Sequence, residues 1–275
     1  MKNIILYMFI FTHVLHAQSK RFIYEYKYVP DSTDKANILR DLMFLDITNH
    51  ESLFYSQYKY SEDSISIAEA KKGKFYIPKA DIMYKIEKKA SKVFFKTIDY
   101  GIGKIKVEDN RKINWEILPD KEKIGKFTAQ KAKCSFGGRK WTAWFTVDLP
   151  IQDGPYKFNG LPGLIVKIED STNSHKFELV GIKNIEKDIQ YPELSARSDE
   201  LYLTQEKFIE LFKKYRKDPA AETRRLYMMG RIPDQKDTSG NSRTGLEIVR
   251  EVDIQAKERI KKDNNIIEID LLEYK

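Results

Sequence analysis

The sequence predicts a mainly β protein of the α+β class, in which an antiparallel sheet, curved into a half-barrel or a sandwich, is followed by C-terminal helices. Three observations predict this class. Short runs of alternating apolar and polar residues, separated by Gly, Asn, Asp and Pro, fill much of the chain between residues 22 and 185. Residues 83–185 show no helical period, which is typical of consecutive antiparallel strands. After Pro192, apolar residues recur at spacings of three and four, as in amphipathic helices.

The first predicted strand covers residues 22–29. Aromatic residues alternate with others from Phe22 to Tyr28, so one face of this strand is expected to be buried. Pro30 ends the alternation. Further strands are predicted at residues 42–47, 53–60, 93–98, 112–118, 127–136, 140–147, 164–170 and 176–182.

Local signals also place turns and helices. The pair Gly137-Gly138 is predicted to form the corner of a hairpin. Thr204 is predicted to be the N-cap of an amphipathic helix that Pro219 stops, and a second helix is expected over residues 249–260. Three segments complete the prediction: 64–72 as a helical turn or a loop, 231–244 as a loop, and 266–272 as a short apolar end that packs as a strand.

The N-terminus has the layout of a cleavable secretory signal. Lys2 precedes an apolar run over residues 4–15, and Ala17 offers a cleavage position. A run of about a dozen residues is shorter than the ~20 needed to span a bilayer, so cleavage is favoured over a membrane anchor. We therefore expect a signal peptide over residues 1–17, an antiparallel β domain over 18–190 and a helical region over 191–275 packed on or beside it. The mature chain is expected to be exported, periplasmic or extracellular, with no transmembrane segment.

Composition limits the classes of protein that this chain can belong to. With 41% hydrophobic residues over 275 positions, the chain can bury a sizeable core without cross-links. Cys134 is the only cysteine, so no internal disulfide can form, and a small buried hydrophobic residue is expected there. The 49 basic residues are offset by 41 scattered acidic ones, and Glu258 interrupts the densest basic cluster, residues 257–262. This pattern argues against nucleic-acid binding.

The segment Gly160–Ile165, with the sequence GLPGLI, is predicted to be a tight turn that leads into a strand. Pro162 suits the second position of a type II turn, and Gly163 would then adopt positive φ. The turn ends a long loop, residues 149–163, that is rich in Pro and Gly. Such a loop can be a structural clasp over a sheet face, a lid or a contact surface. The residues assigned to this structural motif are Gly154, Pro155, Gly160, Leu161, Pro162, Gly163, Leu164 and Ile165.

The motif and its upstream flank resemble a known family. Trp115, Gly138-Arg139, residues 143–146 and residues 153–155 precede the hexapeptide in the order seen in the GLPGLI family of secreted bacterial proteins. The resemblance covers residues 22–185. It implies export by a Gram-negative bacterium of the Bacteroidota type, and it implies no catalytic or ligand residue because no activity is established for that family.

An indole is expected on each face of the strand over residues 140–147. Trp141 lies on one face and Trp144 on the other, whereas a core strand needs only one apolar face. Trp144 must then be covered by a helix, by the loop or by a ligand. The ligand-binding hypothesis places Trp144 in a groove with Tyr156 and Phe158.

The sequence contains no catalytic signature. Beyond the signal, only His50 and His175 are histidines, and no HExxH, CxxC, GxSxG, P-loop or GxGxxG pattern is present. No catalytic residue, metal site or cofactor is therefore predicted. Asp153 and Asp170 are candidates to approach His175 in a dispersed site. Arg139 is expected to form a surface ion pair, for example with Asp148, or to hold a substrate carboxylate; a surface ion pair is also expected for the pair at 224–225.

These observations favour a secreted, non-enzymatic binding or carrier protein of the cell envelope. Its partner is expected to be one of three kinds: an apolar ligand such as a lipid, a peptide, or an envelope protein. No nucleic acid is expected as a partner. Two alternatives stay open: a hydrolase with a dispersed site, and a structural or assembly component of the envelope.

Overall fold

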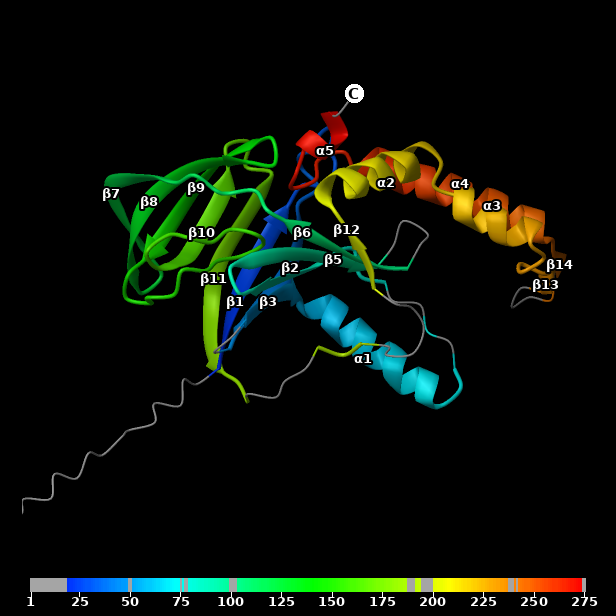
Figure 1. Ribbon diagram of the computed structural model, residues 1–275, viewed down its shortest axis with the longest axis horizontal. Helices are drawn as coiled ribbons and strands as arrows, with labels where there is room; N and C mark the ends of the chain where they lie inside the picture. Colours follow the sequence, from blue (N-terminus) through cyan, green and yellow to red (C-terminus); the bar gives the residue numbers. More distant parts are fainter. Residues whose placement is uncertain are drawn as a thin grey trace, which may run out of the picture.

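The computed structural model describes residues 19–48, 51–74, 76, 79–98, 103–186, 191–193, 200–236, 240 and 242–273. In these ranges, twelve strands form one open sheet, accompanied by a short two-stranded sheet and five helices (Figure 1). The sheet is mostly antiparallel and is not closed into a barrel, which confirms the predicted fold class. The expected signal segment, residues 1–17, lies outside the described residues.

The strands of the large sheet follow the spatial order β12-β6-β5-β4-β3-β2-β1-β11-β10-β9-β8-β7. Every neighbouring pair is antiparallel except β12 and β6, which are parallel. The strands are β1 (Lys20–Tyr28), β2 (Leu39–Ile47), β3 (Glu51–Ser56), β4 (Lys85–Lys89), β5 (Lys92–Ile98), β6 (Lys104–Asp109), β7 (Glu116–Ile124), β8 (Phe127–Phe136), β9 (Arg139–Thr146), β10 (Leu164–Asp170), β11 (His175–Asn184) and β12 (Leu201–Leu203).

Strand β1 lies at the centre of the sheet and joins its two halves. It pairs with β2 on one side and with β11, about 150 residues away in sequence, on the other. Its alternating aromatic residues Phe22, Tyr24 and Tyr26 are buried, as predicted. The face of the sheet that carries these three residues is called the core face below.

The helix α1 (Gln57–Lys71) corrects the prediction for residues 53–60 and 64–72. Strand β3 ends at Ser56, whose hydroxyl accepts a hydrogen bond from the backbone N–H of Lys59 and caps the helix. The buried positions of α1 are polar or charged, and include Lys59, Glu62 and Asp63. Because the inward face is not apolar, the sequence shows no helical period here.

Strands β4, β6 and β7 were missed or misplaced by the sequence pattern. Strand β4 has a single fully buried apolar residue, Ile86, so its alternation is weak. The predicted strand at 112–118 is wrong in its bounds, because the structure places the edge strand β7 at Glu116–Ile124. Most of β7 is exposed, and its pairing with β8 shifts register between Ile117 and Lys121, around Pro119. An exposed edge strand has little apolar alternation to detect.

The C-terminal helices α2 (Gln205–Lys217) and α4 (Gly245–Lys262) confirm the predicted helices, including the N-cap at Thr204 and the stop before Pro219. Between them lie α3 (Ala221–Met228), which was not predicted, and the short strands β13 (Gln235–Lys236) and β14 (Ser242–Arg243) within the expected loop. The strand expected at 266–272 is wrong, because this segment ends in the helix α5 (Asp270–Glu273). Ile267 and Leu271 are nevertheless buried.

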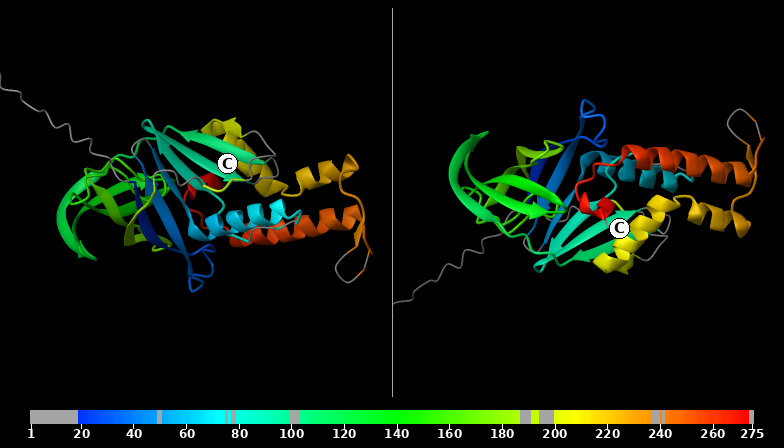
Figure 2. Two further views of the ribbon diagram at one scale, coloured as in Figure 1. Left: turned by 90° about the horizontal axis from the view of Figure 1, so that it is seen from below. Right: turned by 90° about the horizontal axis from the view of Figure 1, so that it is seen from above.

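Two clusters of apolar side chains hold the helices and the long loop to the sheet. Phe208 and Phe212 of α2 pack with Ile105 and Val107 of β6. The larger cluster fills the core face and contains residues from β1 to β3, from β8 to β11 and from the loop before β10. The strands that follow β7 curl strongly (Figure 2), and their inner side chains belong to this larger cluster. The core face is therefore filled by the protein's own side chains.

Candidate functional site

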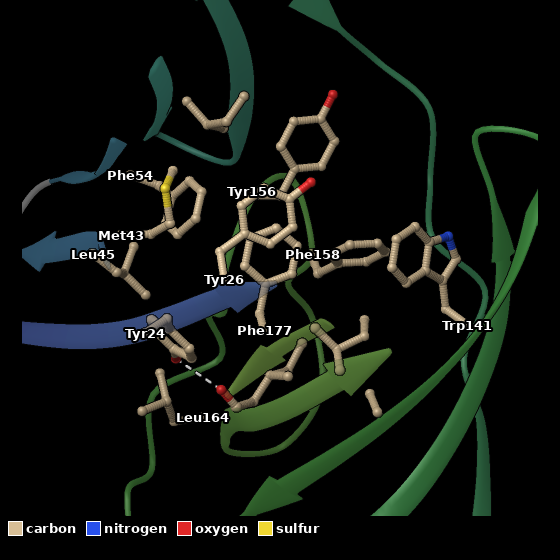
Figure 3. Close-up of a cluster of buried hydrophobic side chains, with 14 of the residues drawn as sticks. Tyr24, Tyr26, Met43, Leu45, Phe54, Trp141, Tyr156, Phe158, Leu164 and Phe177 are labelled. Atoms are coloured by element: carbon tan, nitrogen blue, oxygen red, sulfur yellow. Dashed lines mark hydrogen bonds between the residues drawn. The ribbon is translucent and has the colours of Figure 1, made fainter. Parts of the chain in front are cut away.

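The loop at residues 149–163, called the motif loop below, is packed into the core. Tyr156, Phe158 and Leu161 are almost completely buried. Figure 3 shows Tyr156 and Phe158 among the aromatic rings of Tyr26 and Trp141. A loop with so many buried side chains can hold its shape only if its buried polar groups have partners.

One set of partners surrounds Asp153. Its carboxylate accepts hydrogen bonds from the Ser52 hydroxyl (2.5 Å), from the Lys88 ammonium and from the backbone N–H of Gly154 (2.7 Å). Lys88 also donates to the carbonyl oxygens of Gly154 (2.7 Å) and Phe158 (3.2 Å). Ser52 and Lys88 are directly opposite each other on β3 and β4. These contacts fix the start of the motif loop to the sheet.

A second set surrounds the buried side chain of Lys157. Its ammonium donates to Asp109 at the end of β6 (2.7 Å) and to Glu268 of the C-terminal segment (2.5 Å). Glu268 also accepts from the Tyr156 hydroxyl (2.6 Å). Burial alone would raise the pKa of the Glu268 carboxyl, but the charges of Lys157 and Arg111 hold that pKa below its ordinary value. The cluster therefore joins the motif loop, the sheet and the C-terminus through ionised groups.

The two glycines of the hexapeptide have different roles from those predicted. The positive φ lies at Gly160 (91°) and not at Gly163, so the predicted type II turn with Gly163 in the left-handed region is wrong. A Cβ atom at Gly163 would lie 2.2 Å from the carbonyl oxygen of Thr146. Gly163 is thus required by the close approach of two backbone segments, not by its φ angle.

The structure does not bring Trp144 together with Tyr156 and Phe158. Trp144 is 8% exposed and lies on the face opposite the core face, whereas the other two residues lie in the core. Its cluster includes Ile124 and Val166, and all members come from strands, so neither a helix nor the motif loop supplies the cover. The Lys167 ammonium lies 4.3 Å from the indole. Ligand binding by the three aromatic residues stays a prediction.

The histidine of the sheet belongs to a buried hydrogen-bond network. The Tyr26 hydroxyl bonds to Nδ1 of His175 (2.7 Å), and Nε2 bonds to the carbonyl oxygen of Asn265 (2.8 Å). A carbonyl oxygen only accepts, so the proton of His175 is on Nε2 and Tyr26 donates to Nδ1. Burial first, and then the charge of Arg139, lower the pKa of His175 to about 4. Both ring nitrogens are therefore occupied in a neutral imidazole.

Arg139 is placed differently from the prediction. It is buried and forms an ion pair with Asp170 (3.0 Å), not a surface pair with Asp148. Its guanidinium also donates to the carbonyl oxygen of Ile266 (2.7 Å). Asp170 does approach His175, by accepting from its backbone N–H (2.8 Å). The network ties the β9–β11 strands to the C-terminal segment.

The other candidate for a dispersed site, Asp153, does not reach His175. Asp153 is bound to Ser52 and Lys88 at the start of the motif loop. His50 lies outside the described residues. Within the ranges that the structure describes, no group of three or more His, Cys, Asp or Glu side chains is placed to hold a metal ion.

An open depression lies where the outer edge of the motif loop meets the ends of strands β2 to β5. We call it the loop-edge depression. Its volume is about 350 Å³, at the lower end of the range of small-ligand sites, about 300–1,000 Å³. It is lined by Ile47, Thr48, Glu51 and Ser52, by residues 88–93, and by Gln152, Asp153, Asn159 and Gly160.

The β4–β5 turn at the rim of the depression has an unusual backbone. Ala90 and Ser91 both adopt positive φ, 48° and 64°, without being glycines. They are the two central residues of the hairpin between the paired residues Lys89 and Lys92, and a two-residue turn of type I′ requires positive φ at both. On the opposite rim, the carbonyl oxygen of Asn159 accepts a hydrogen bond from the Trp115 indole (2.9 Å). Both rims are therefore held in fixed positions.

The polar groups at the floor of the depression anchor the motif loop. The Ser52 hydroxyl donates its only proton to Asp153, and Ser52 is itself buried. The ammonium of Lys88 uses its three donor positions on Asp153, Gly154 and Phe158. Burial lowers the pKa of Lys88, and the charge of Asp153 opposes this effect. A fully bonded ammonium is not available as a general base.

A second cavity, of about 60 Å³, lies beside α1 and contains mainly ion pairs. Lys85 packs over the ring of Tyr191 (3.8 Å) and pairs with Glu193 (2.5 Å). Lys96 pairs with Glu200 (3.1 Å) in the same wall. With about 60 Å³ against about 350 Å³, this cavity has less room for a ligand than the loop-edge depression.

One family model matches the part of the chain that contains the motif loop. A model of the family described as "Protein of unknown function (Porph_ging)" matches residues 136–167, which span β9, the motif loop and the start of β10. The match is consistent with the expected Bacteroidota-type family, although its description does not name GLPGLI. A comparison with curated proteins finds no match.

Two crystal structures of PNGF-II, in space groups C2 and P21, are similar in fold. Their TM-scores are 0.53 and 0.52, at 17% sequence identity. The similarity covers 73% of this chain and 34% of the PNGF-II chain, so it spans about a third of the length of that protein. At this identity the similarity shows the fold alone. Separately, no helix among the described residues is long and apolar enough to cross a membrane.

No local sequence pattern marks the residues that anchor the motif loop. Lys88 lies in a strand that the pattern missed, and Ser52 is an ordinary polar residue in its strand. The only signal for Lys157 is its position between the aromatic residues Tyr156 and Phe158. The depression itself depends on the convergence of two turns and a loop, which no local pattern indicates.

Proposed function

We propose that this protein is a non-enzymatic binding protein of the cell envelope that holds a segment of a peptide or protein partner in the loop-edge depression. The observation that carries the proposal is that one wall of the depression is formed by the motif loop, at Gln152–Asp153 and Asn159–Gly160. The motif loop is anchored by buried ion pairs, so its outer edge is a preorganised surface.

The chemistry of the depression favours a polar partner of low net charge. The ammonium of Lys88 is balanced by Asp153, and Lys89 pairs with Glu51 (2.9 Å) at the rim. The rim pair is about half exposed, so it contributes little to stability and can be exchanged for contacts with a partner. Backbone amides and short polar side chains suit such a mixed surface. A polypeptide segment offers both.

An apolar cargo is less compatible with the structure. The core face is occupied by Tyr156, Phe158 and Leu161 of the motif loop together with aromatic residues of the sheet. A lipid would have to displace these side chains, which are almost fully buried. The peptide or protein partner is therefore favoured over the lipid among the ligands considered from the sequence.

Export is part of the same proposal. Export is supported by the signal-like sequence of the first 17 residues and by the GLPGLI resemblance. The division of the mature chain at residue 190 into a β domain and a helical region is proposed with it. N-terminal sequencing of the protein isolated from its native cell tests this part. We expect a mature chain that starts at Gln18, whereas an intact Met1 in the isolated protein would contradict export by cleavage.

The binding site is tested with an array of 15-residue peptides from envelope proteins. The depression is blocked by Gln152→Arg, at an exposed position of its wall, and the matched control is Val180→Arg at an exposed position of β11. We expect binding of a subset of peptides that Gln152→Arg lowers by at least about tenfold and Val180→Arg leaves unchanged. Equal binding by both variants would contradict the proposed site.

A further inference from the structure

The far end of the α3–α4 pair carries a group of exposed apolar side chains. The two helices pack against each other and project away from the sheet (Figure 1). At this end Gly245, the first residue of α4, lies against the ring of Tyr227 in α3, because a Cβ on Gly245 would come within 2.8 Å of it. The end of α3, with Tyr227, Met228 and Met229, therefore lies beside the start of α4, with Leu246, and we call these four residues the tip cluster.

The tip cluster is unusually exposed for large apolar residues. Met228 is 77% exposed, Met229 52%, Leu246 41% and Tyr227 37%. Scattered single apolar residues are normal on a protein surface, but several that gather at one end of a helix pair favour a contact site. Met side chains also adapt to irregular or fluid partners because they are flexible and polarisable.

Cations surround the tip cluster. Arg225 donates to the sulfur of Met229 (3.1 Å), and Arg231 is exposed directly after the end of α3. Over residues 222–250 the sequence has six Arg or Lys residues and four Asp or Glu residues, which gives a net charge of +2. The ion pairs of Arg224 with Asp218 and of Arg225 with Glu222 are largely exposed, so they are weak and exchangeable.

We propose that the tip cluster is a contact site for an anionic lipid surface. The four side chains expose on the order of 400 Å², which is half of the roughly 800 Å² that each partner contributes to a standard protein interface. This area is small for a stable protein complex. It suits shallow insertion of apolar groups between lipid headgroups, with the neighbouring guanidiniums on the phosphates.

The position of the tip cluster fits this role. Helix α4 has 18 residues, so it holds the cluster about 27 Å from its other end, which joins the sheet region through residues 263–269. The chain can touch a surface with the tip while the sheet stays in water. The contact is independent of the proposed ligand site in the loop-edge depression.

Vesicle co-sedimentation tests the proposal on the full mature chain, residues 18–275. The probes are vesicles of phosphatidylcholine alone and vesicles with 30% phosphatidylglycerol. We expect binding to the anionic vesicles that decreases from 0.05 to 0.5 M NaCl, because salt screens the arginines. The double variant Met228→Ser/Met229→Ser should lower the partition coefficient at least about tenfold.

The matched control is Ile254→Ser, which removes a similarly exposed apolar side chain (59%) from α4 outside the tip cluster. Its binding should equal that of the unmodified chain, and the thermal melting of all variants should agree because the changed residues are exposed. Absence of binding to anionic vesicles, or equal losses in the double variant and the control, would overturn the proposal. So would concentration-dependent self-association, lost in the double variant, in place of vesicle binding.

Discussion

The motif loop and the α3–α4 pair both use salt bridges, but under opposite conditions. In the motif loop, Lys157 and its partners Asp109 and Glu268 are almost completely buried. On α3, Arg225 pairs with Glu222 while more than half of its side chain is exposed. Removing one member of a buried pair leaves an uncompensated charge, whereas an exposed pair is already solvated. The same type of contact therefore fixes the position of the loop and does little for the helix.

Lys157→Met is expected to have one of the two largest effects. The substitution leaves the buried carboxylates of Asp109 and Glu268 with one shared cation, Arg111, in place of two, so the free energy of unfolding should fall by about 3 kcal/mol. The matched control is Lys257→Met on α4, where Lys257 pairs with Asp253 (2.7 Å) on the surface and less than about 0.5 kcal/mol is expected. Urea unfolding measures both. Similar losses in the two variants would remove the distinction between the regions.

Gly163→Ala is expected to have the other of the two largest effects. The new Cβ would meet the Thr146 carbonyl oxygen at 2.2 Å, so the backbone of the loop or of β9 must move, at a cost of about 3–4 kcal/mol. Gly160→Ala is the control, since its Cβ has no atom within 4 Å and only the positive φ is strained, at a cost of about 1–2 kcal/mol. A larger loss of melting temperature for Gly160→Ala would show that φ, and not the close approach, requires the glycines.

Acidification should lower the free energy of unfolding through His175, which lies in the large sheet. Burial and the charge of Arg139 lower the pKa of His175 from 6.5 to about 4, so between these pH values the unfolded chain binds a proton that the folded chain does not. Stability therefore falls as the pH falls through this window, by on the order of 3 kcal/mol. Urea unfolding at a series of pH values measures this dependence, and in His175→Gln the fall in the free energy of unfolding between pH 6.5 and 4 should be smaller by this amount. An unchanged slope from pH 6.5 to 4 would assign the loss to other groups.

The smallest effect is expected for Thr244→Ala, at the start of α4. Thr244 and Glu247 form a capping box, with the Thr244 hydroxyl accepting from the Glu247 N–H (3.2 Å). Its loss should cost about 1 kcal/mol and should raise amide hydrogen exchange in the first turn of α4 alone. Faster exchange in the motif loop of this variant would show that the two regions are coupled.

The fold class could be predicted because it rests on local patterns. The bounds of β8 and β10 follow from alternation, and Gly137 and Gly138 both adopt the positive φ that their hairpin needs. The helix α1 could not be predicted, because its buried face carries Lys59 and Asp63 in place of apolar residues. Their burial depends on partners from other segments, such as the Tyr191 hydroxyl that donates to Asp63 (2.8 Å).

The candidate site was predicted only in part. The sequence drew attention to the motif loop and to Asp153. It gave no indication of Ser52 and Lys88, which are about 100 and 65 residues away from Asp153 in the chain. The expected surface position of Arg139 was wrong, since a single charged residue in a hairpin looks the same whether its partner is solvent or the buried Asp170.

By itself the sequence determined the strands that alternate, the hairpin at Gly137-Gly138 and the cap at Thr204, because each depends on residues within a few positions of one another. The tertiary structure decided which charges are buried, which side chains cover Trp144, and where the loop-edge depression forms. These depend on contacts between segments far apart in the chain. The energy of a buried polar group is set by its partners, and no local pattern contains them.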